Sequence, residues 1–228
     1  MAGLLVAAAG LVGCSDIAPT GGASPAPTPT RSTAPTAAPP SSPADPPSTK
    51  PSPTSKPTAS GVAAMTIPAI GVRGLRVVPY VGTADDRPGT VIQNRGVAAS
   101  PRGPRGGVGP GDVGNFIITG HRTSHGRPLG QVPELVNGDH ILITVGGTVY
   151  DYVVNRTMTI SFRKPAEKAQ QNAAVPGRPG ARPTQAMITI STCATTEDHA
   201  AGNFWSDELG NPEHRINKIG TLVATRQL

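Results

Sequence analysis

A proline-rich stretch from residue 15 to residue 60 is the feature that most restricts how this chain can fold. It holds 13 of the 26 prolines, mixed with Ala, Thr and Ser, and it has no aromatic residue. Such a composition cannot bury enough apolar surface to offset the entropy lost on ordering. We therefore expect a disordered linker over 15–60 and one globular domain over 62–228, a length that suits a single hydrophobic core.

The segment before the linker predicts export from the cytoplasm. Residues 1–13 are mostly apolar, too few to cross a bilayer as a helix, and end in small residues as a signal peptide does. Residues 11–14, Leu-Val-Gly-Cys, fit the bacterial lipoprotein box, in which Cys14 is lipidated and becomes the new N-terminus. No Lys or Arg precedes the apolar run, and an uncleaved membrane anchor is the alternative. Both interpretations predict a domain outside the cytoplasm, held at a bacterial cell membrane by residues 1–14.

The net charge of +6 invites a nucleic-acid interpretation, which the arrangement of the charges does not favour. Lys and Arg are scattered singly among Gly and Pro, without interleaved aromatic residues or a known nucleic-acid motif. We therefore expect no nucleic-acid partner. A cationic domain outside the cell would be attracted to an anionic cell envelope.

Alternating and apolar runs rich in β-branched residues predict a mainly all-β domain. The expected strands cover residues 65–72, 75–81, 91–92, 116–119, 141–145, 148–154, 157–162, 187–193 and 216–223. Gly146 and Gly147 predict a two-residue hairpin turn, and short helical pieces are expected near 129–135 and 166–172. Irregular connections are expected over 83–112, 163–184 and 194–213. Around eight strands, few helices and frequent turns indicate a single closed eight-stranded β-barrel, largely antiparallel, with short helices.

Three chemically complementary side chains stand at predicted strand ends. Cys193 ends one predicted strand, His121 follows another, and Arg215 opens a third. A lone cysteine is often a buried core residue, but an unpaired thiol in an exported protein suggests reactivity. A thiol, an imidazole and a guanidinium at one rim of a barrel supply the nucleophile, the proton carrier and the oxyanion partner of acyl transfer.

The same residues carry a resemblance to the sortase family. Residues 189–193, Thr-Ile-Ser-Thr-Cys, resemble the sortase signature Thr-Leu-x-Thr-Cys, with Ile190 in place of Leu. Residues 109–123 resemble the segment that leads to the sortase histidine, and Arg215 matches the third catalytic position. The resemblance covers about residues 65–228 and is closest to the actinobacterial class E sortases.

The resemblance implies a sortase-type barrel and a cysteine transpeptidase over residues 62–228. Cys193 would attack the threonine carbonyl of a C-terminal sorting signal, Leu-Pro-x-Thr-Gly or, in class E, Leu-Ala-x-Thr-Gly, and form a thioester. His121 would protonate the departing amine, and Arg215 would hold the substrate carbonyl or its oxyanion. The acceptor would be an amine of a peptidoglycan precursor or a lysine of a partner protein such as a pilin. No cofactor or metal is expected, and we expect a monomer.

Four further residues adjoin Cys193 or His121, or follow Cys193 in the sequence, and their roles are open. Thr192 and Gly120 adjoin that pair and are candidate substrate-binding residues, although a threonine is also an ordinary strand residue. Phe204 and Trp205 follow in the connection after the strand 187–193. They form either an aromatic wall of a substrate groove or the anchor of their own loop.

The remaining histidines are expected to play no catalytic part. His214 should point to the opposite side of its strand from Arg215. His125 follows the candidate catalytic histidine by four residues, a spacing that binds metal on a helix but has no such meaning on a loop rich in Gly and Pro. His140 and His199 are expected at the surface.

Two other functions remain open. A non-catalytic envelope-binding lipoprotein built on a β-barrel would keep its function after Cys193→Ala. A hydrolase-only thiol peptidase would pass its thioester to water, so its products would not depend on an amine acceptor. The acceptor dependence of the products separates these functions.

Overall fold

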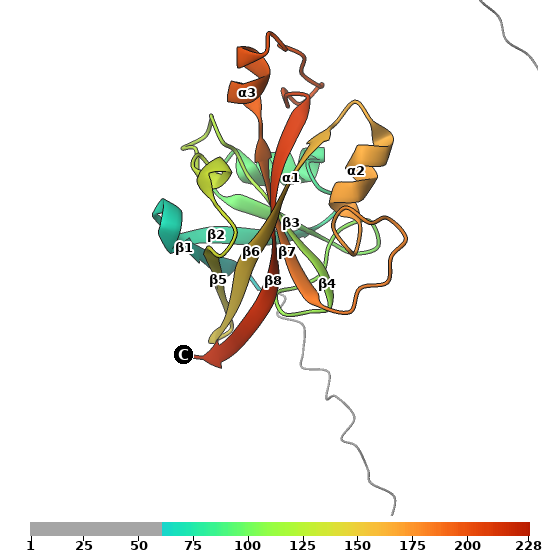
Figure 1. Ribbon diagram of the computed structural model, residues 1–228. Helices are drawn as coiled ribbons and strands as arrows, with labels where there is room; N and C mark the ends of the chain where they lie inside the picture. Colours follow the sequence, from blue (N-terminus) through green and yellow to red (C-terminus); the bar gives the residue numbers. More distant parts are fainter. Residues whose placement is uncertain (1–60) are drawn as a thin grey trace, which may run out of the picture. The chain divides into compact units, whose positions relative to one another are not determined.

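Eight strands close into a barrel in the computed structural model, which describes residues 61–228 (Figure 1). The strands are β1 (Ala63–Ile67), β2 (Val72–Val81), β3 (Ala98–Arg102), β4 (Gly114–Thr119), β5 (His140–Val145), β6 (Thr148–Ser161), β7 (Ala186–Cys193) and β8 (His214–Gln227). The helices are η1 (Pro68–Ile70), α1 (Arg87–Gln93), η2 (Val132–Glu134), α2 (Pro165–Asn172) and α3 (Thr195–Ala200), where η marks a 3-10 helix. The order around the barrel is β1-β2-β3-β4-β7-β8-β6-β5, and β5 pairs again with β1.

The pairing of β4, β7 and β8 decides what gathers at one rim of the barrel. β4 runs parallel to β7, so both strands end at the same edge of the sheet. β8 runs antiparallel to β7 and therefore begins at that edge. Figure 1 shows α3 at this rim and α2 beside it. Three segments that are far apart in the sequence thus meet at one end of the molecule.

The interior of the barrel is filled mainly by aliphatic side chains. Phe116 and Tyr152 contact each other there, with ring centroids 6.4 Å apart. The other large members of the buried cluster include Met65, Ile67, Val77, Ile118, Leu129, Ile141, Ile143, Val154, Ile188 and Ile190. Burying one such side chain contributes ~1.5–3 kcal/mol. The β-branched residues that predict the strands therefore also supply most of the core.

Strand β7 uses its two faces differently. Ile188 and Ile190 belong to the core cluster inside the barrel. The alternate residues Thr189, Ser191 and Cys193 therefore face outward. Helices α1 and α2 hydrogen bond to Thr119 and Asn115 of the neighbouring strand β4, and Thr189 and Ser191 of β7 are buried as well. The cysteine thus stands at the end of a covered outer face and not in the core.

The connection between β2 and β4 differs from the expectation. The predicted strand at 91–92 is wrong, because Val91 and Ile92 lie in helix α1. Asp86 caps this helix by accepting a hydrogen bond from the Gly89 N–H at 2.9 Å, and a proline occupies the first turn. These local signals outweigh the strand propensity of a β-branched pair. Strand β3 also lies within the connection that was expected to be irregular.

Elsewhere the expected elements are present with changed limits. The strands expected over 148–154 and 157–162 form one continuous strand, β6, whose register with β8 shifts near residue 155. The two glycines before β6 have the positive φ angles, 56° and 76°, that a tight hairpin turn requires. Helix α3 lies within the connection expected over 194–213. The closed eight-stranded barrel with short helices is confirmed.

The N-terminal part of the sequence lies outside the described residues. The expected signal or anchor over 1–14, with the lipidation candidate Cys14, falls there, as does the expected linker over 15–60. From residue 61 onward, no helix is both long enough and apolar enough to span a membrane.

Candidate active site

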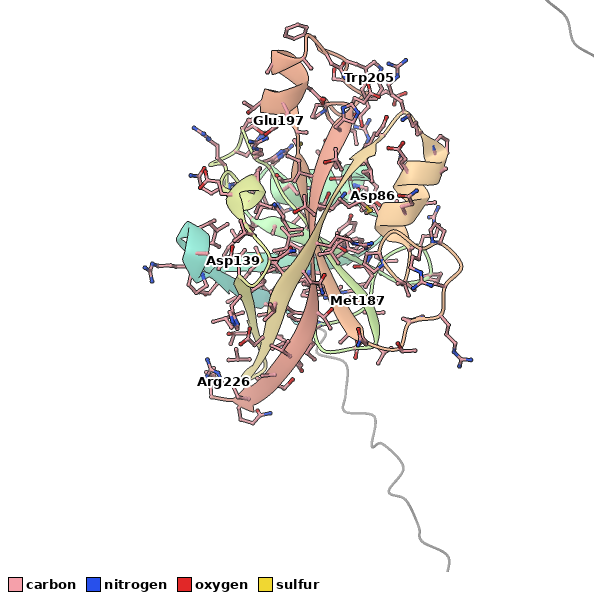
Figure 2. The ribbon with its side chains drawn as sticks, viewed as in Figure 1. Asp86, Asp139, Met187, Glu197, Trp205 and Arg226 are labelled. Carbon is pink, nitrogen blue, oxygen red and sulfur yellow. The ribbon has the colours of Figure 1, made fainter. Side chains whose placement is uncertain are left out.

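Cys193 and Arg215 are paired across two neighbouring strands. Cys193 ends β7, Arg215 is the second residue of β8, and their Cα positions are partners in the antiparallel ladder. A hydrogen bond from the Ala194 N–H to the His214 carbonyl, 3.0 Å long, extends the ladder beyond them. Trp205 marks the same end of the barrel in Figure 2. The pairing places the thiol and the guanidinium on one outward face.

His121 reaches the same rim from β4. Thr119, the last residue of β4, is the partner of Ser191 in the parallel ladder, and the Gly120 N–H donates to the Ser191 carbonyl at 3.3 Å. His121 lies two residues beyond Thr119, as Cys193 lies two residues beyond Ser191, so the two strands present them at the same level. Both side chains line one pocket of about 450 Å³.

The pocket beside Cys193 is lined by neutral polar, imidazole and aromatic groups. Its lining is Thr90, Asn94, His121, Thr123, Ser124, His125, Cys193, Thr195, His199, Phe204, Trp205, Ser206, Leu209, Gly210, Asn211 and Pro212. No Asp, Glu, Lys or Arg is among these described residues. The titratable side chains among these lining residues are therefore the Cys193 thiol and the imidazoles of His121, His125 and His199.

The two loop aromatics line the pocket and also contact neighbouring side chains. Phe204 is 71% exposed, lines the pocket, and lies with its ring centroid 4.8 Å from that of His199. Trp205 also lines the pocket, and the guanidinium carbon of Arg163 lies 5.8 Å from its ring. Each ring thus lines the pocket and also lies against one neighbouring side chain.

The imidazole of His121 is held by two neighbours. Its Nε2 lies 2.7 Å from Asn94 Oδ1, and its ring stacks on His125 with centroids 4.6 Å apart and planes at 24°. Because the amide oxygen accepts from Nε2–H, Nδ1 is left as the proton acceptor. Burial lowers the pKa of His121, His125 and Arg215 lower it further, and Asp85 opposes them. The imidazole is therefore neutral at neutral pH.

The thiol of Cys193 is also neutral in the resting site. Burial raises its pKa above the ordinary value, and the carboxylates of Asp85 and Asp207 act in the same direction. Arg215 and Arg122 oppose this shift. The cysteine therefore has to lose its proton as it reacts, and the neutral imidazole of His121, which lines the same pocket, can take that proton.

Arg215 is buried, with 1% of its surface exposed. Its Nη1 donates to the carbonyls of Pro212 at 3.0 Å and His214 at 3.3 Å, and Cζ lies 4.0 Å from the centroid of the Phe162 ring. Nε lies 3.5 Å from Asp85 Oδ2, an ion-pair distance without hydrogen-bond geometry. Nε and Nη2 therefore have no hydrogen-bond partner within residues 61–228. These N–H groups can donate hydrogen bonds to a negatively charged oxygen.

Sequence reasoning missed three residues that support the site. Asn94 holds His121, and Asp85 pairs with Arg215. Arg122 donates from Nη1 to the Cys193 carbonyl at 3.3 Å and forms a two-pronged ion pair with a carboxylate of α3. Arg122 belongs to the Gly-His-Arg-Thr run, but nothing in that run indicates its partners. The helix cap at the start of α1 was the available signal for Asn94, because it places this residue on the last turn of a helix facing β4.

The two candidate substrate-binding residues have packing contacts in the structure. The Thr192 hydroxyl is buried and donates to the Gly120 carbonyl at 3.0 Å. A Cβ on Gly120 would lie 2.8 Å from a side-chain carbon of Leu129, so a larger residue would not fit without a shift. Neither residue is among those that line the pocket.

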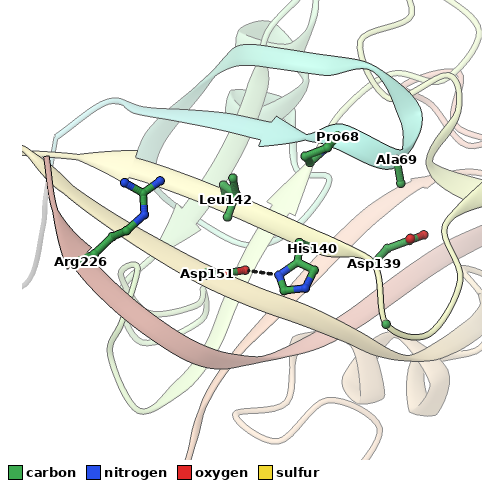
Figure 3. Close-up of a pocket in the computed structure, with 8 residues that line it drawn as sticks. Pro68, Ala69, Asp139, His140, Leu142, Asp151 and Arg226 are labelled. Atoms are coloured by element: carbon green, nitrogen blue, oxygen red, sulfur yellow. Dashed lines mark hydrogen bonds and ion pairs between the residues drawn. The ribbon is translucent and has the colours of Figure 1, made fainter.

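The other histidines lie apart from the thiol or at the margin of the pocket. His214 Nδ1 lies 2.6 Å from Asp198 Oδ1, and its backbone N–H donates to Asp198 Oδ2, which anchors α3 to the start of β8. His199 is exposed at the pocket lining. His140 is exposed and lies 2.8 Å from Asp151 in a separate pocket of about 520 Å³ (Figure 3). No group of three or more His, Cys, Asp or Glu side chains in residues 61–228 is placed to hold a metal ion.

Comparisons with known proteins identify the family and agree with the barrel fold. A family model described as Sortase domain matches residues 65–204. The SrtA sortase from Actinomyces oris has a TM-score of 0.56 at 18% identity, covering 75% of this chain and 83% of that chain. Sortase E1 from Streptomyces coelicolor has a TM-score of 0.55 at 21% identity, covering 74% and 91%. Sortase E from Streptomyces avermitilis has a TM-score of 0.53 at 21% identity, covering 75% and 92%. A search of curated proteins found no match to this sequence.

Proposed function

This chain belongs to the sortase family of cysteine transpeptidases, and we propose that it cleaves a C-terminal sorting signal and joins the released acyl group to an amine. The observation that carries the proposal is the pairing of Cys193 with Arg215 beside a pocket that His121 also lines. The proposed signal resembles Leu-Pro-x-Thr-Gly or, as in class E sortases, Leu-Ala-x-Thr-Gly. The Streptomyces coelicolor sortase E1 holds a tripeptide in its active site, which supports a peptide ligand here.

The proposed first half-reaction forms a thioester. The Cys193 sulfur attacks the threonine carbonyl carbon while its proton moves to Nδ1 of His121. The carbonyl oxygen becomes negative and accepts hydrogen bonds from the free N–H groups of Arg215. The carbon–nitrogen bond then breaks, and His121 gives its proton to the departing glycine amine. The acyl group remains on sulfur, so its energy is kept for the next step.

The proposed second half-reaction uses the uncharged pocket as the entrance for the acceptor. A neutral amine attacks the thioester carbonyl and loses a proton to His121, and the carbon–sulfur bond breaks. The thiolate then recovers a proton, which restores the resting thiol and imidazole. The acceptor is an amine of a peptidoglycan precursor or a lysine of a partner protein such as a pilin. Because the described lining contains no carboxylate, ammonium or guanidinium group, it favours an acceptor amine that is uncharged and has no charged group beside it.

The neutral resting pair has a consequence for the rate. Since burial raises the pKa of Cys193 and lowers that of His121, the reactive thiolate–imidazolium form is a minor species. Arg215 favours the thiolate, and a bound substrate that excludes water strengthens this attraction. The proposed enzyme therefore gains reactivity when its substrate binds.

The proposed position in the cell follows from the N-terminal segment. We propose that Cys14 is lipidated, or that residues 1–14 remain as an anchor, and that residues 15–60 link this segment to the catalytic domain. The catalytic domain over 62–228 then works outside the cytoplasm at the bacterial membrane. All three catalytic candidates come from one chain, which supports action as a monomer.

The products formed with and without an amine test the proposal against its two alternatives. Sorting-signal peptides are incubated with the protein, with or without a glycine oligomer or a lysine derivative, and the products are separated by mass. A transpeptidase gives the ligated product when the amine is present. A hydrolase gives the same free acid under both conditions, and a non-catalytic lipoprotein gives no product.

A further inference from the structure

The outward face of the sheet carries a second row of polar side chains beside the catalytic row. Ser191 and Asn217 are Cα partners in the β7–β8 ladder, two residues away from the Cys193–Arg215 pair. Thr119 of β4 is the partner of Ser191 on the other side. Because side chains alternate along a strand, Thr119, Ser191 and Asn217 face outward with the thiol and the guanidinium.

This row carries hydrogen-bonding atoms that the described part of the chain does not satisfy. Asn217 is 0% exposed, and both its Oδ1 and its Nδ2 lack a partner. Ser191 and Gln171 of α2 are each 1% exposed, and Ser191 Oγ and Gln171 Oε1 are unpartnered. With Nε and Nη2 of Arg215, six of the eight such buried atoms in residues 61–228 belong to these four side chains. Each costs ~1–3 kcal/mol, so their clustering requires a reason.

The cover over this row is polar as well. Gln93 Nε2 of α1 donates to Thr119 Oγ1 at 3.0 Å, and Gln171 Nε2 of α2 lies 3.4 Å from Asp85 Oδ2. Asp85 in turn lies 3.5 Å from Arg215 Nε. A helix that only packs on a sheet presents an apolar face to it. A polar floor beneath a polar cover, next to the reactive thiol, has the composition expected of a binding subsite.

We propose that Ser191 and Asn217 form a subsite that binds an uncharged amide or hydroxyl side chain of the peptide substrate. This inference rests on the proposed transpeptidase function and adds a substrate preference to it. The two rows are two residues apart, about 6.6 Å in an extended strand, so the recognised side chain lies about two residues from the cleaved bond. An amide fits Asn217 best, because it offers one donor and one acceptor to the free Oδ1 and Nδ2.

Other side chains suit this subsite less well. An apolar side chain excludes water and leaves the same atoms unpaired. A cationic side chain meets the guanidinium of Arg215, and an anionic one meets the carboxylate of Asp85. The neutral polar class is the one that satisfies the row without a like-charge contact.

Ser191 and Asn217 are covered in this structure, so the proposed subsite requires the contact between Asp85 and Gln171 to break on binding. Asp85 has a φ angle of 60°, a region of backbone conformation that residues other than Gly adopt uncommonly. Its contact with Gln171 is long for a hydrogen bond. When Asp85 and Gln171 separate, Ser191, Asn217 and the free N–H groups of Arg215 become available together.

The test exchanges an amide for an aliphatic side chain of similar shape on both partners. Sorting-signal peptides that keep threonine directly before the cleaved bond, and carry Asn or Leu at the second or third position before it, are offered to the wild-type protein and to Asn217→Leu. The rate at which Cys193 becomes acylated is followed by intact-protein mass. We expect the wild type to prefer Asn at one position by at least about tenfold, because a site built for hydrogen bonds rejects an apolar analogue. Asn217→Leu is expected to reverse that preference.

A matched control keeps the test specific. Asn155→Leu makes the same change at an exposed residue of β6 whose amide donates to Thr221 Oγ1, and it should leave the preference intact. If Asn217→Leu does not fold, Ser191→Ala replaces it and should weaken the preference. Acylation without any preference for Asn, or a preference unchanged in the variants, contradicts the subsite and leaves the transpeptidase function standing. No acylation by any peptide contradicts both.

Discussion

Nε of Arg215 lies 3.5 Å from Oδ2 of Asp85, and the side chains of both residues are almost completely buried. The carboxylate gives the guanidinium a counter-charge, so that Arg215 is not an isolated cation in the protein interior. Asp85 also acts on the reacting groups, because it raises the pKa values of both Cys193 and His121. One loop residue before α1 thus influences all three catalytic candidates.

Replacing Asp85 by Asn is expected to make the thiol more acidic. The carboxylate raises the pKa of Cys193, so its removal lowers that pKa, and the thiolate appears at a lower pH. The measurement is the rate of alkylation by iodoacetamide against pH. Glu208→Gln removes an exposed carboxylate of the β7–β8 connection and should leave the midpoint unchanged. A midpoint that moves to higher pH in Asp85→Asn would refute the assigned influence.

His125→Phe is expected to shift the acid limb of the pH–rate profile to higher pH. The variant keeps an aromatic ring against His121 but removes a neighbour that lowers the pKa of His121. With a higher pKa, His121 becomes protonated, and unable to accept the thiol proton, at a higher pH. The pKa is measured by the NMR titration of the His121 ring proton. His140→Phe, in the separate pocket, is the control and should not shift it.

Asn94 is expected to act as a positioning residue for His121. Asn94→Leu removes the acceptor for Nε2–H, so the acylation rate should fall about tenfold, on the order of one hydrogen bond. Asn94→Asp keeps the acceptor and adds a charge, so it should restore much of the rate and raise the pKa of His121. A merely structural role predicts equal losses in both variants and no change in the pH profile.

Arg215→Lys is expected to lower kcat/KM for a sorting-signal peptide by about 10²–10³-fold. The ammonium cannot reproduce the planar fork that bonds the Pro212 carbonyl, stacks on Phe162 and still offers free N–H groups. Thermal unfolding of the variant is measured in parallel, because loss of the fork also affects packing. A folded variant with kcat/KM close to that of the wild type would show that the guanidinium is not needed.

The residues at strand ends were the part of the site that the sequence could predict. Alternation along residues 187–193 places Cys193 at the end of a half-buried strand, and the apolar runs before His121 and after Arg215 do the same for those residues. Their meeting at one rim depends on the parallel β4–β7 pairing, which local patterns do not specify. Here the resemblance to a family supplied what periodicity could not.

The supporting contacts could not be predicted for a physical reason. Asp85 and Asn94 both lie in the connection expected over 83–112, where a β-branched pair suggested a strand, whereas the capped helix α1 determines where both side chains point. The burial of Ser191 and Asn217 could not be predicted either. Both lie on the face opposite the core, and their burial depends on how segments distant in the sequence pack over that face.

The mass of the protein after a short incubation with a sorting-signal peptide tests the central claim most directly. The account predicts an acyl adduct on Cys193 that retains the residues before the cleaved bond and disappears when an amine is added. His121→Ala and Arg215→Ala should each suppress the adduct, and Cys193→Ala should abolish it. A wild-type protein that is folded but gains no adduct from any such peptide, or that carries it on another residue, would contradict the account.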